Sequence, residues 1–569
     1  MKKVLVVVFL FLSMSLFANS LMMYDLSDSI YDEMEDLYIL EGKASPMGAK
    51  PWSDVDVKHL LDRIEPETDA GIALKNRLLS RVRGSENEAK FDFSVSFAPY
   101  FGVHSSKDTN YIAALDDYNA TLFDMGLGFY YSDNVALFMN VSLGAEPTDL
   151  IKLEFQQQDP DSNNKNPYPE ITNVDIKYNP AEKNYISNIP YLPRGLDALN
   201  FPNRFYATFG FDAFRVFAGR SRAELGNGVM GNVLMGDTLP YHDMLSLTFT
   251  GSKWFHYQML VDFYTPFKNF GNGSDRVPLE GIRFLLAHRF EFSLFSGKLL
   301  FALQDSVMYH SDSMFIDPRV LSPMFFLHNG FIAGNSNSLA TIEVEYAPVK
   351  NFSLYAQLGI DDLAMPNEPK APEEEATANS IALMGGMRMR YPFKDGYFHG
   401  NLEIVGTSPF MYHRATGQGK AGGYDFSFVS SLRYNSGGVP GIFRYLSFPF
   451  GSDSIAGQLS FGYKKPGLFD TNMSFFVLAD GVIDMFSVTR WFSGSESAHN
   501  GYPSTSNPFD EREKGNVEYT FSLGFDGEYT PFSWLELSGG LYFVYVSNIN
   551  NGSMDAFDVQ LSLGAKFSY

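Results

Sequence analysis

The chain has 569 residues, and 43 Lys plus Arg against 66 Asp plus Glu give a formal net charge of −23. This acidic excess argues against a nucleic-acid-binding protein, which would carry a basic patch. The chain has no cysteine, which excludes thiol catalysis, disulfides and cysteine-ligated metal sites. Charged residues make up 19% and aromatic residues 16% of the chain, a balance that is unusual for a cytosolic enzyme.

The first twenty residues have the pattern of a secretory signal peptide. Two lysines precede an apolar stretch over 4–17, which is too short to cross a bilayer as a helix. Ala18 and Ser20 place small residues where a signal peptidase would cut after Ser20. The alternative, an anchor helix, fits less well because polar and acidic residues follow at once. We therefore predict a signal peptide over 1–20 and no transmembrane helix in the exported chain.

The next segment has helical periodicity. Apolar residues recur at helical spacing over about 27–40, 53–64 and 68–82, and Ser53 is suited to cap the second helix. The sequence therefore predicts a helical region over 21–90 that contains three helices.

From residue 91 onwards, polar and apolar residues alternate. In the last stretch, 557–569, seven apolar or aromatic residues share one parity and six polar or small residues share the other. In an outer membrane, the apolar face of such a strand meets lipid and the polar face lines the lumen. Strands of roughly 10–14 residues are longer than those of most soluble sheets and suit a tilted membrane span. A soluble sandwich is the alternative.

The connections between strands alternate in length, and aromatic residues adjoin the short ones, as in the interfacial girdles of membrane barrels. We predict tight turns at 132–134, 251–253, 348–351, 392–396 and 530–533, and long loops near 145–203, 223–242, 265–280, 305–338, 361–379, 408–424 and 487–515. The prediction is an all-β transmembrane barrel over 91–569 with about 18 antiparallel strands. A range of 16–20 is allowed because 434–463 could hold two extra strands or an irregular loop. The three helices are expected to cluster beneath the periplasmic mouth, since a polar lumen offers their apolar faces no partner.

The middle of the chain carries a family resemblance. The residues that carry it run in order through Arg204-Phe205-Tyr206, Phe217 to Arg222, Leu225 to Gly228, Asn232 to Met235, Leu239-Pro240-Tyr241, Asp317-Pro318, Leu321-Ser322-Pro323, His328-Asn329-Gly330, Asn335-Ser336-Asn337 and Leu354 to Asp362. This order resembles the capsule-assembly Wzi family of outer-membrane barrels. The helical prefix, with Leu37-Tyr38 to Gly42 and then Pro51-Trp52, is similar to the N-terminal region of that family. The resemblance implies an 18-stranded barrel with periplasmic helices that holds exported capsular polysaccharide at the cell surface and has no enzymatic activity.

Charged residues that parity places in the lumen are the candidate ligand-binding residues. If Leu383 and Met387 face lipid, then Arg388 and Arg390 face inward. The same reasoning applied to the strand 282–294 places Arg283, Arg289 and Glu291 in the lumen. Arginine facing lipid near the bilayer centre would cost about 2–4 kcal/mol. The candidates, for an anionic solute or an acidic glycan, are Arg283, Arg289, Glu291, Arg388, Arg390 and, on a strand of ambiguous parity, Arg220 and Arg222. The alternative is that these arginines pair with lumenal acids and fill the barrel.

Catalytic motifs are weak or missing in the sequence. Gly226-Asn227-Gly228-Val229-Met230-Gly231 matches G-x-G-x-x-G, but no helix pattern follows it, and we interpret these glycines as loop residues. The ten histidines show no metal-ligand spacing, and no G-x-S-x-G elbow occurs. We predict a protein that is not an enzyme and needs no cofactor.

Two functions remain open from sequence. One is binding or attachment of surface polysaccharide. The other is a porin or substrate channel for small solutes, which the inward arginines suggest are anionic. The expected partners are outer-membrane lipid, surface polysaccharide and, through the C-terminal strand, the barrel-insertion machinery. We expect a monomer in the outer membrane.

Overall fold

The structure of the protein is a computed structural model. It describes residues 20–83, 89–106, 108–109, 111–113, 121–131, 134–144, 151–155, 174–178, 185–189, 197–198, 201–211, 213–265, 281–311, 315–323, 336–362, 379–413, 415–416, 424–430, 432–433, 440–442, 444–483 and 516–569. Apart from Ser20, the predicted signal peptide lies outside these residues.

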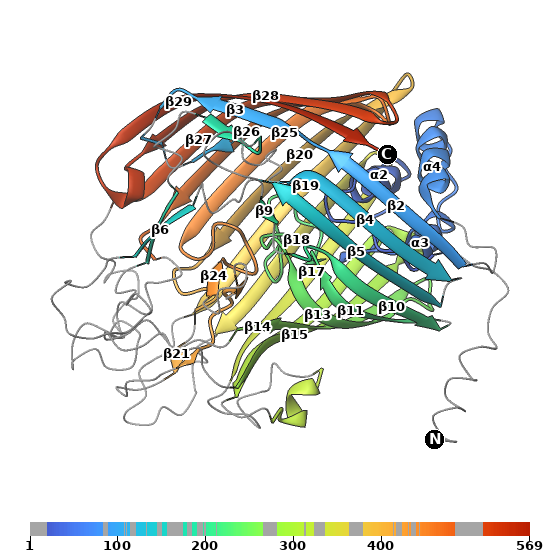
Figure 1. The fold of residues 1–569 in the computed structure, drawn as a ribbon, viewed down its shortest axis with the longest axis horizontal. Coiled ribbons are helices and arrows are strands. Elements are labelled where there is room, and N and C mark those ends of the chain that lie inside the picture. The colour runs from blue at the N-terminus through green and yellow to red at the C-terminus, as the bar shows by residue number, and fades with distance from the viewer. Residues whose placement is uncertain are drawn as a thin grey trace.

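Eighteen antiparallel strands of the described chain form a closed barrel (Figure 1), which confirms the predicted fold class. The first strand is interrupted and is numbered β2 and β3, and β29 closes the ring by pairing with both. In wall order the strands are β2 (Ala89–Phe97) with β3 (Tyr100–His104), β4 (Thr121–Tyr131), β5 (Val135–Gly144), β10 (Phe205–Phe211), β11 (Phe214–Ser221), β13 (His242–Phe249), β14 (Phe255–Tyr264), β15 (Ile282–Leu294), β16 (Leu299–Ser311), β17 (Ser336–Val349), β18 (Phe352–Asp362), β19 (Ser380–Phe393), β20 (Gly396–Thr407), β25 (Ser454–Lys465), β26 (Phe469–Asp480), β27 (Glu518–Phe532), β28 (Leu535–Ser547) and β29 (Asp555–Ser568).

Alternation along each strand separates an outer from an inner face. On β29, Phe557 and Leu563 are 58% and 59% exposed, whereas Asp558 and Gln560 are fully buried. Because successive side chains point to opposite sides of a strand, the exposed apolar set faces outward and the polar set faces the lumen. The alternation predicted from sequence therefore corresponds to the outer and inner faces of the barrel wall.

Short turns lie at one end of the barrel, here called the turn end, and long connections lie at the other, the loop end. All five predicted tight turns fall between consecutive wall strands, although 132–133 of the first turn lie outside the described residues. One predicted loop needs correction. Because β16 extends to Ser311 and β17 begins at Ser336, the predicted loop 305–338 is too long. Residues 434–463 add no extra wall strand among the described residues, because β25 begins only at Ser454.

The remaining elements are short. They are β6 (Ile151–Phe155) with β7 (Val174–Tyr178), β8 (Tyr185–Ser187) on β3, β9 (Asp197–Ala198) on β5, β21 (Ala415–Thr416) with β22 (Tyr424–Asp425), β23 (Leu432–Arg433) with β24 (Pro440–Ile442), β1 (Ala49–Lys50) with β12 (Glu224–Leu225), and the 3-10 turns η4 (Phe295–Gly297), η5 (Pro318–Leu321) and η7 (Ile549–Asn551).

Three helices gather at the turn end: α2 (Ile30–Leu40), α3 (Asp54–Leu61) and α4 (Asp69–Arg81) (Figure 1). Ser53 caps α3 in a reciprocal capping box with Asp56, as expected from sequence. Helix α2 contacts the turn between β17 and β18, since the Asn351 amide of that turn donates to the Ile39 carbonyl at 2.8 Å. No helix of the described residues has the length and apolar character to cross a bilayer.

The helices do not cluster on their own, which corrects the expectation that the lumen offers them no apolar partner. Their apolar residues share one buried core with inward-facing wall residues such as Tyr206, Phe217 and Tyr355. The inner wall of the barrel carries aromatic rings at this end, so the apolar faces of the helices pack against the wall. We call residues 20–83 the plug.

Candidate functional site: the filled lumen

At the turn end, ion pairs join the plug to the inner wall. Glu35 of α2 lies 2.8 Å from Nε of Arg388 on β19, and Asp36 pairs with Arg390 two residues further along the same strand. The Tyr397 hydroxyl donates to the other Asp36 oxygen at 2.5 Å. All these groups except Glu35 are nearly inaccessible to solvent. Charge-assisted bonds in a low-dielectric site hold the plug in one position.

Midway along the lumen, the plug meets a segment that enters from the loop end. This segment, residues 222–241, is called inner loop 1. Its strand β12 forms a two-stranded antiparallel ladder with β1 of the plug. The Gly226 amide donates to the Gly48 carbonyl at 2.8 Å, and Lys50 lies 2.8 Å from Glu224. Segments from the two mouths of the barrel are thus hydrogen-bonded to each other inside it.

Three polar side chains hold the glycine-rich part of inner loop 1. The Gln357 amide donates to Asn232 Oδ1 at 2.7 Å, and Asn232 in turn donates to Glu224 at 2.6 Å. The Glu403 carboxylate on β20 accepts the Val229 and Met230 amides, both at 2.7 Å. No helix follows the glycines within 222–241, so the G-x-G-x-x-G match lies in a loop folded against the wall.

The loop end of the lumen is occupied by inner loop 2, which comprises the described parts of 408–453. Several of its aromatic residues are buried, among them Phe410, Tyr412, Phe428 and Phe448. The Tyr412 hydroxyl donates to the Val233 carbonyl at 3.0 Å, which joins inner loop 2 to inner loop 1. The plug, inner loop 1 and inner loop 2 therefore form one hydrogen-bonded column from the turn end to the loop end.

The predicted site residues on β15 lie inside the lumen, and each has protein partners. Arg289 is fully buried and pairs with Glu291 and with Glu343 at 2.8 Å. Glu291 also accepts the Gly48 amide of the plug at 2.9 Å. Arg283, nearer the loop end, donates to two carbonyls of inner loop 2, those of Ser427 at 3.2 Å and Val429 at 3.0 Å.

The two predicted arginines of β19 are likewise inside and occupied. Arg388 is 1% exposed, is bonded to Glu35 and Glu345 and the Asn227 carbonyl, and stacks on the Tyr355 ring at 3.8 Å. Arg390 pairs with Asp36 and donates to Asn401 at 2.9 Å. These interactions correspond to the alternative weighed from sequence, in which the arginines pair with acids and fill the barrel.

Arg220 and Arg222 lie apart, and the lumenal placement of Arg220 is corrected. Arg220 pairs in register with outward-facing Phe205 and with Asp243, to which it bonds at 2.6 Å. The parity was ambiguous because β11 carries aromatic residues on both faces: Phe214 is exposed and Phe217 is buried. Arg222 follows the end of β11 and pairs with Asp237 of inner loop 1 and with Asp25 of the plug.

Several residues of this network were not predicted from sequence. Glu345 and Glu403 alternate with outward-facing apolar neighbours, Val344 and Ile404, so the strand period used for the arginines would have found them. Glu35 and Asp36 had no such signal, because their helix could have faced water. Asn232 had none either, since only the three-dimensional fold of inner loop 1 brings it to Gln357.

The electrostatics of the plug depend on this pairing. Burial opposes the charged form of Asp36, but Arg390 and Lys464 outweigh it, and the pKa of Asp36 lies below its usual value. Burial also opposes ionisation of Asp25, yet Arg204 and Arg222 lower its pKa to about 2. Both carboxyl groups are therefore ionised at neutral pH and attract the cations around them.

One side of the lumen is less filled. Near the turn end, the inward-facing Ser94, Glu528 and Lys566 remain exposed, on β2, β27 and β29. Towards the loop end the same side carries a second apolar cluster of buried side chains, which comprises Tyr100, Ile112, Ala113, Ile186, Tyr542, Val544, Val546, Ile549 and Ala556. The exposed polar wall thus leads to an apolar core and not to an evident binding site.

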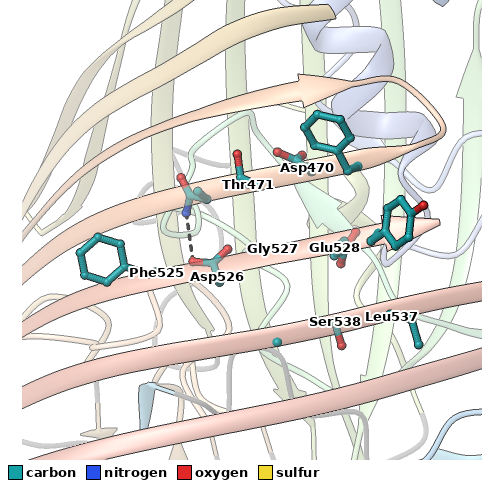
Figure 2. Close-up of a pocket in the computed structure, with 12 residues that line it drawn as sticks. Asp470, Thr471, Phe525, Asp526, Gly527, Glu528, Leu537 and Ser538 are labelled. Carbon is teal, nitrogen blue, oxygen red and sulfur yellow. Dashed lines mark hydrogen bonds between the residues drawn. The ribbon is translucent and has the colours of Figure 1, made fainter. Parts of the chain in front are cut away.

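A hollow of about 650 Å³ lies at the wall formed by β26, β27 and β28 (Figure 2). Gly527 and Gly539 are paired across two of these strands and leave space between larger side chains. Asn472 donates to Asp526 at 3.3 Å. Among the described residues, no group of three histidine or acidic side chains is arranged to hold a metal ion.

A closed barrel of eighteen strands, with an apolar outer face and a polar inner face, is an outer-membrane β-barrel. No family model and no curated protein matches the chain. Among solved structures, the chain is similar to Wzi of Escherichia coli, an outer-membrane protein involved in group 1 capsule assembly and described as a carbohydrate-binding β-barrel. The identity is 12%, the TM-score is 0.56, and 96% of this chain and 99% of that chain are covered.

The chain is also similar to Pseudomonas aeruginosa OccD3, with 9% identity, a TM-score of 0.41 and coverage of 85% of this chain and 94% of that chain. For OprD of the same organism the identity is 9%, the TM-score is 0.39, and the coverage is 85% and 98%. The chain thus has the fold of Wzi, an 18-stranded barrel with short N-terminal helices.

Proposed function

We propose that the protein is a non-enzymatic, non-conducting outer-membrane barrel that binds polysaccharide at the cell surface. The observation that carries the proposal is the column inside the barrel, in which the plug, inner loop 1 and inner loop 2 are bonded in series. An 18-stranded wall is wide enough for a lumen. Filling that lumen with ordered chain favours a binding scaffold over a route for solutes.

The arginines support the same choice. The arginines suggested as an anion site each bond to carboxylates or carbonyls of the chain, and Arg289 and Arg388 are buried beneath the column. A transport site needs hydrogen-bond donors that a solute can reach. The guanidinium groups of these arginines instead bond to carboxylates and carbonyls of the protein itself. The polysaccharide-binding role itself is supported by the similarity in fold to a barrel described as carbohydrate-binding. Ligand contact would fall to the loop end, which faces outward when the helices are periplasmic.

Two measurements test the proposal together. Purified protein in planar bilayers is expected to show no steady conductance, and immobilised protein is expected to retain polysaccharide extracted from the surface of the producing cells. The matched control for retention is the same protein after the long loops have been removed from its surface by protease. Large, steady conductance together with no retention would overturn the proposal.

The second candidate function is a channel along the less-filled side of the lumen. The exposed Ser94, Glu528 and Lys566 favour it, because polar inward residues in contact with solvent are what a water-filled route needs. On the inner face of the wall around that hollow, Asp526 and Glu528 would favour cations, contrary to the anionic solutes expected from sequence. Steady, cation-selective conductance of the intact protein would support this candidate.

A further inference from the structure

The first described residues are buried inside the turn end of the barrel. Ser20 is fully buried, and Leu21 and Met22 are 3% and 2% exposed. Leu21 and Met22 pack with Tyr130 and Ala136 of the inner wall. The Leu21 carbonyl accepts a hydrogen bond from the Thr208 hydroxyl at 3.0 Å. Residues 20–22 therefore lie between the barrel wall and α3, away from solvent.

A buried carboxylate, Asp54 of α3, lies at this starting point. Asp54 is fully buried and accepts hydrogen bonds from the Tyr24 hydroxyl at 2.5 Å and from the Arg83 amide at 3.0 Å. The Ser20 side chain bonds to the same carboxyl group, and the Asp54 amide donates to the Met22 carbonyl at 3.3 Å. The carboxylate thus faces residues 20–24 directly.

The charges around Asp54 do not balance. The guanidinium of Arg83 is 3.4 Å from Asp54 and 3.2 Å from Asp92, so one cation is shared by two carboxylates. Burial raises the pKa of Asp54 above its usual value, although Arg83 and the hydrogen bonds act in the other direction. Since a buried carboxylate needs close partners and Arg83 is shared with Asp92, the site can accommodate a further positive charge.

We propose that cleavage after Ser20 creates this charge, and that the new α-ammonium group of Leu21 forms a buried ion pair with Asp54. Leu21 N is joined to Ser20 by the bond that is cut, so the ammonium group forms beside the hydroxyl that now bonds to Asp54. The ion pair fixes the first residue of the mature chain between α3 and the wall. Removal of the signal peptide thereby completes the plug.

The covalent step is a hydrolysis by a signal peptidase, with water as the co-reactant. The bond between the Ser20 carbonyl carbon and Leu21 N breaks, the water oxygen joins Ser20 as a carboxylate, and Leu21 N takes up protons to become an ammonium ion. The Ser20 carboxylate leaves with the signal peptide, so its negative charge does not stay near Asp54. The exported chain is cut before it folds, which allows the new end to be buried afterwards.

The first test is chemical and needs no variant. N-terminal sequencing of protein from outer membranes is expected to begin at Leu21. Acetylation of the full-length folded protein, followed by mass spectrometry, is expected to label the Leu21 α-amine at least tenfold more slowly than in protein unfolded by heat. A different first residue, or equal labelling of the folded and unfolded chains, would overturn the proposal.

The second test moves the charge and keeps the side chains. Inserting Gln-Gln-Ser after Ser20 leaves a mature chain in which serine again precedes Leu21, but the ammonium group lies three residues away, and glutamine in place of a small residue three positions before Leu21 leaves no second cleavage site. Trypsin cleavage within 20–83 is expected to become on the order of tenfold faster or more, because removing one partner of a buried pair is strongly destabilising. Heat-modifiable mobility on gels checks that the barrel itself is intact.

A double-mutant cycle separates pairing from packing. In the Asp54→Asn background, the insertion is expected to accelerate trypsin cleavage much less than it does in the protein that keeps Asp54. Asp92→Asn is the matched control, since Asp92 also pairs with Arg83 but is 39% exposed, and in that background the insertion is expected to keep its full effect. Equal effects of the insertion beside aspartate and asparagine at position 54 would show that no ion pair forms.

Discussion

Glu35 and Arg388 are bonded at 2.8 Å across the boundary between helix α2 and strand β19, and the same guanidinium lies 3.4 Å from Glu345. One side chain of the wall thus neutralises two carboxylates that come from different parts of the fold. Arg388 is 1% exposed. Its charge therefore matters for how firmly the plug is held.

Replacing Arg388 by methionine is expected to loosen the plug. The change leaves Glu35 and Glu345 without their cation, and breaking a buried pair in this way costs about 3–5 kcal/mol. Trypsin cleavage within 20–83 should accelerate strongly. Arg319→Gln is the control, because Arg319 is 60% exposed and pairs only with its neighbour Asp317 among the described residues. Equal cleavage of both variants would contradict the structural role of Arg388.

Removing residues 21–83 is expected to raise conductance in planar bilayers. The increase should be partial, since inner loops 1 and 2 stay in the lumen. The deletion also takes away Glu35, Asp36 and Asp56, the partners of Arg388, Arg390 and Arg215. Reversal potentials should therefore shift towards anion selectivity. A truncated protein that conducts no better than the full chain would mean that the inner loops alone close the barrel.

Gly226→Ala is expected to weaken the junction of plug and inner loop 1. Gly226 has a φ of +135°, and an added Cβ would lie 2.1 Å from Asn232 Oδ1. Strain of this kind costs about 1–3 kcal/mol. Cleavage of the plug by trypsin should accelerate. Gly457→Ala on β25 should not matter, since its added Cβ would meet its nearest neighbour at 3.8 Å. The junction is not critical if the two variants behave alike.

Acid is expected to loosen the plug only well below neutral pH. The folded pKa of Asp25 is about 2, below the roughly 3.9 of an unfolded aspartate. Its stabilisation is therefore present above about pH 4 and is lost as the pH falls towards 2. Hydrogen exchange of the peptide 20–40, corrected for intrinsic rates, should stay constant from pH 8 to 5 and rise below 4. Asp25→Asn should flatten that rise; an unchanged rise in the variant would assign the acid effect to other groups.

Deleting Phe567–Tyr569 is expected to remove the protein from outer-membrane fractions. Phe567 pairs with Phe97 of β2, and the Tyr569 and Val95 backbones exchange two hydrogen bonds. These contacts close the barrel beside the interruption between β2 and β3. The assay is heat-modifiable mobility of membrane extracts. Deleting Lys2 and Lys3 should instead block export earlier. A normally folded barrel without residues 567–569 would show that closure tolerates their loss.

The wall of the barrel could be predicted from sequence because lipid and lumen impose opposite demands on alternate residues. That rule places Leu383 outside and Arg388 inside without knowledge of the partners. It does not say what an inward charge meets. The partner of Arg388 lies some 350 positions earlier in the chain, and no local pattern links the two.

The interior was harder to predict for the same physical reason. A lumen that holds water needs polar residues, whereas one that holds chain can carry Tyr206 and Phe217. Inner loop 1 reads as an ordinary surface loop, since glycines and polar residues are typical of both. Only the accepting groups on the wall, such as Gln357 and Glu403, explain why it turns inward.

The ladder between β1 and β12 has a consequence for the order of assembly. It joins a segment anchored at one mouth to a segment anchored at the other, and wall strands surround it on all sides. Both segments must lie inside the lumen before these bonds can form. The closing edges, β2 and β29, come directly after the plug and in the last part of the sequence. We therefore expect the wall to close around a core that is already in place.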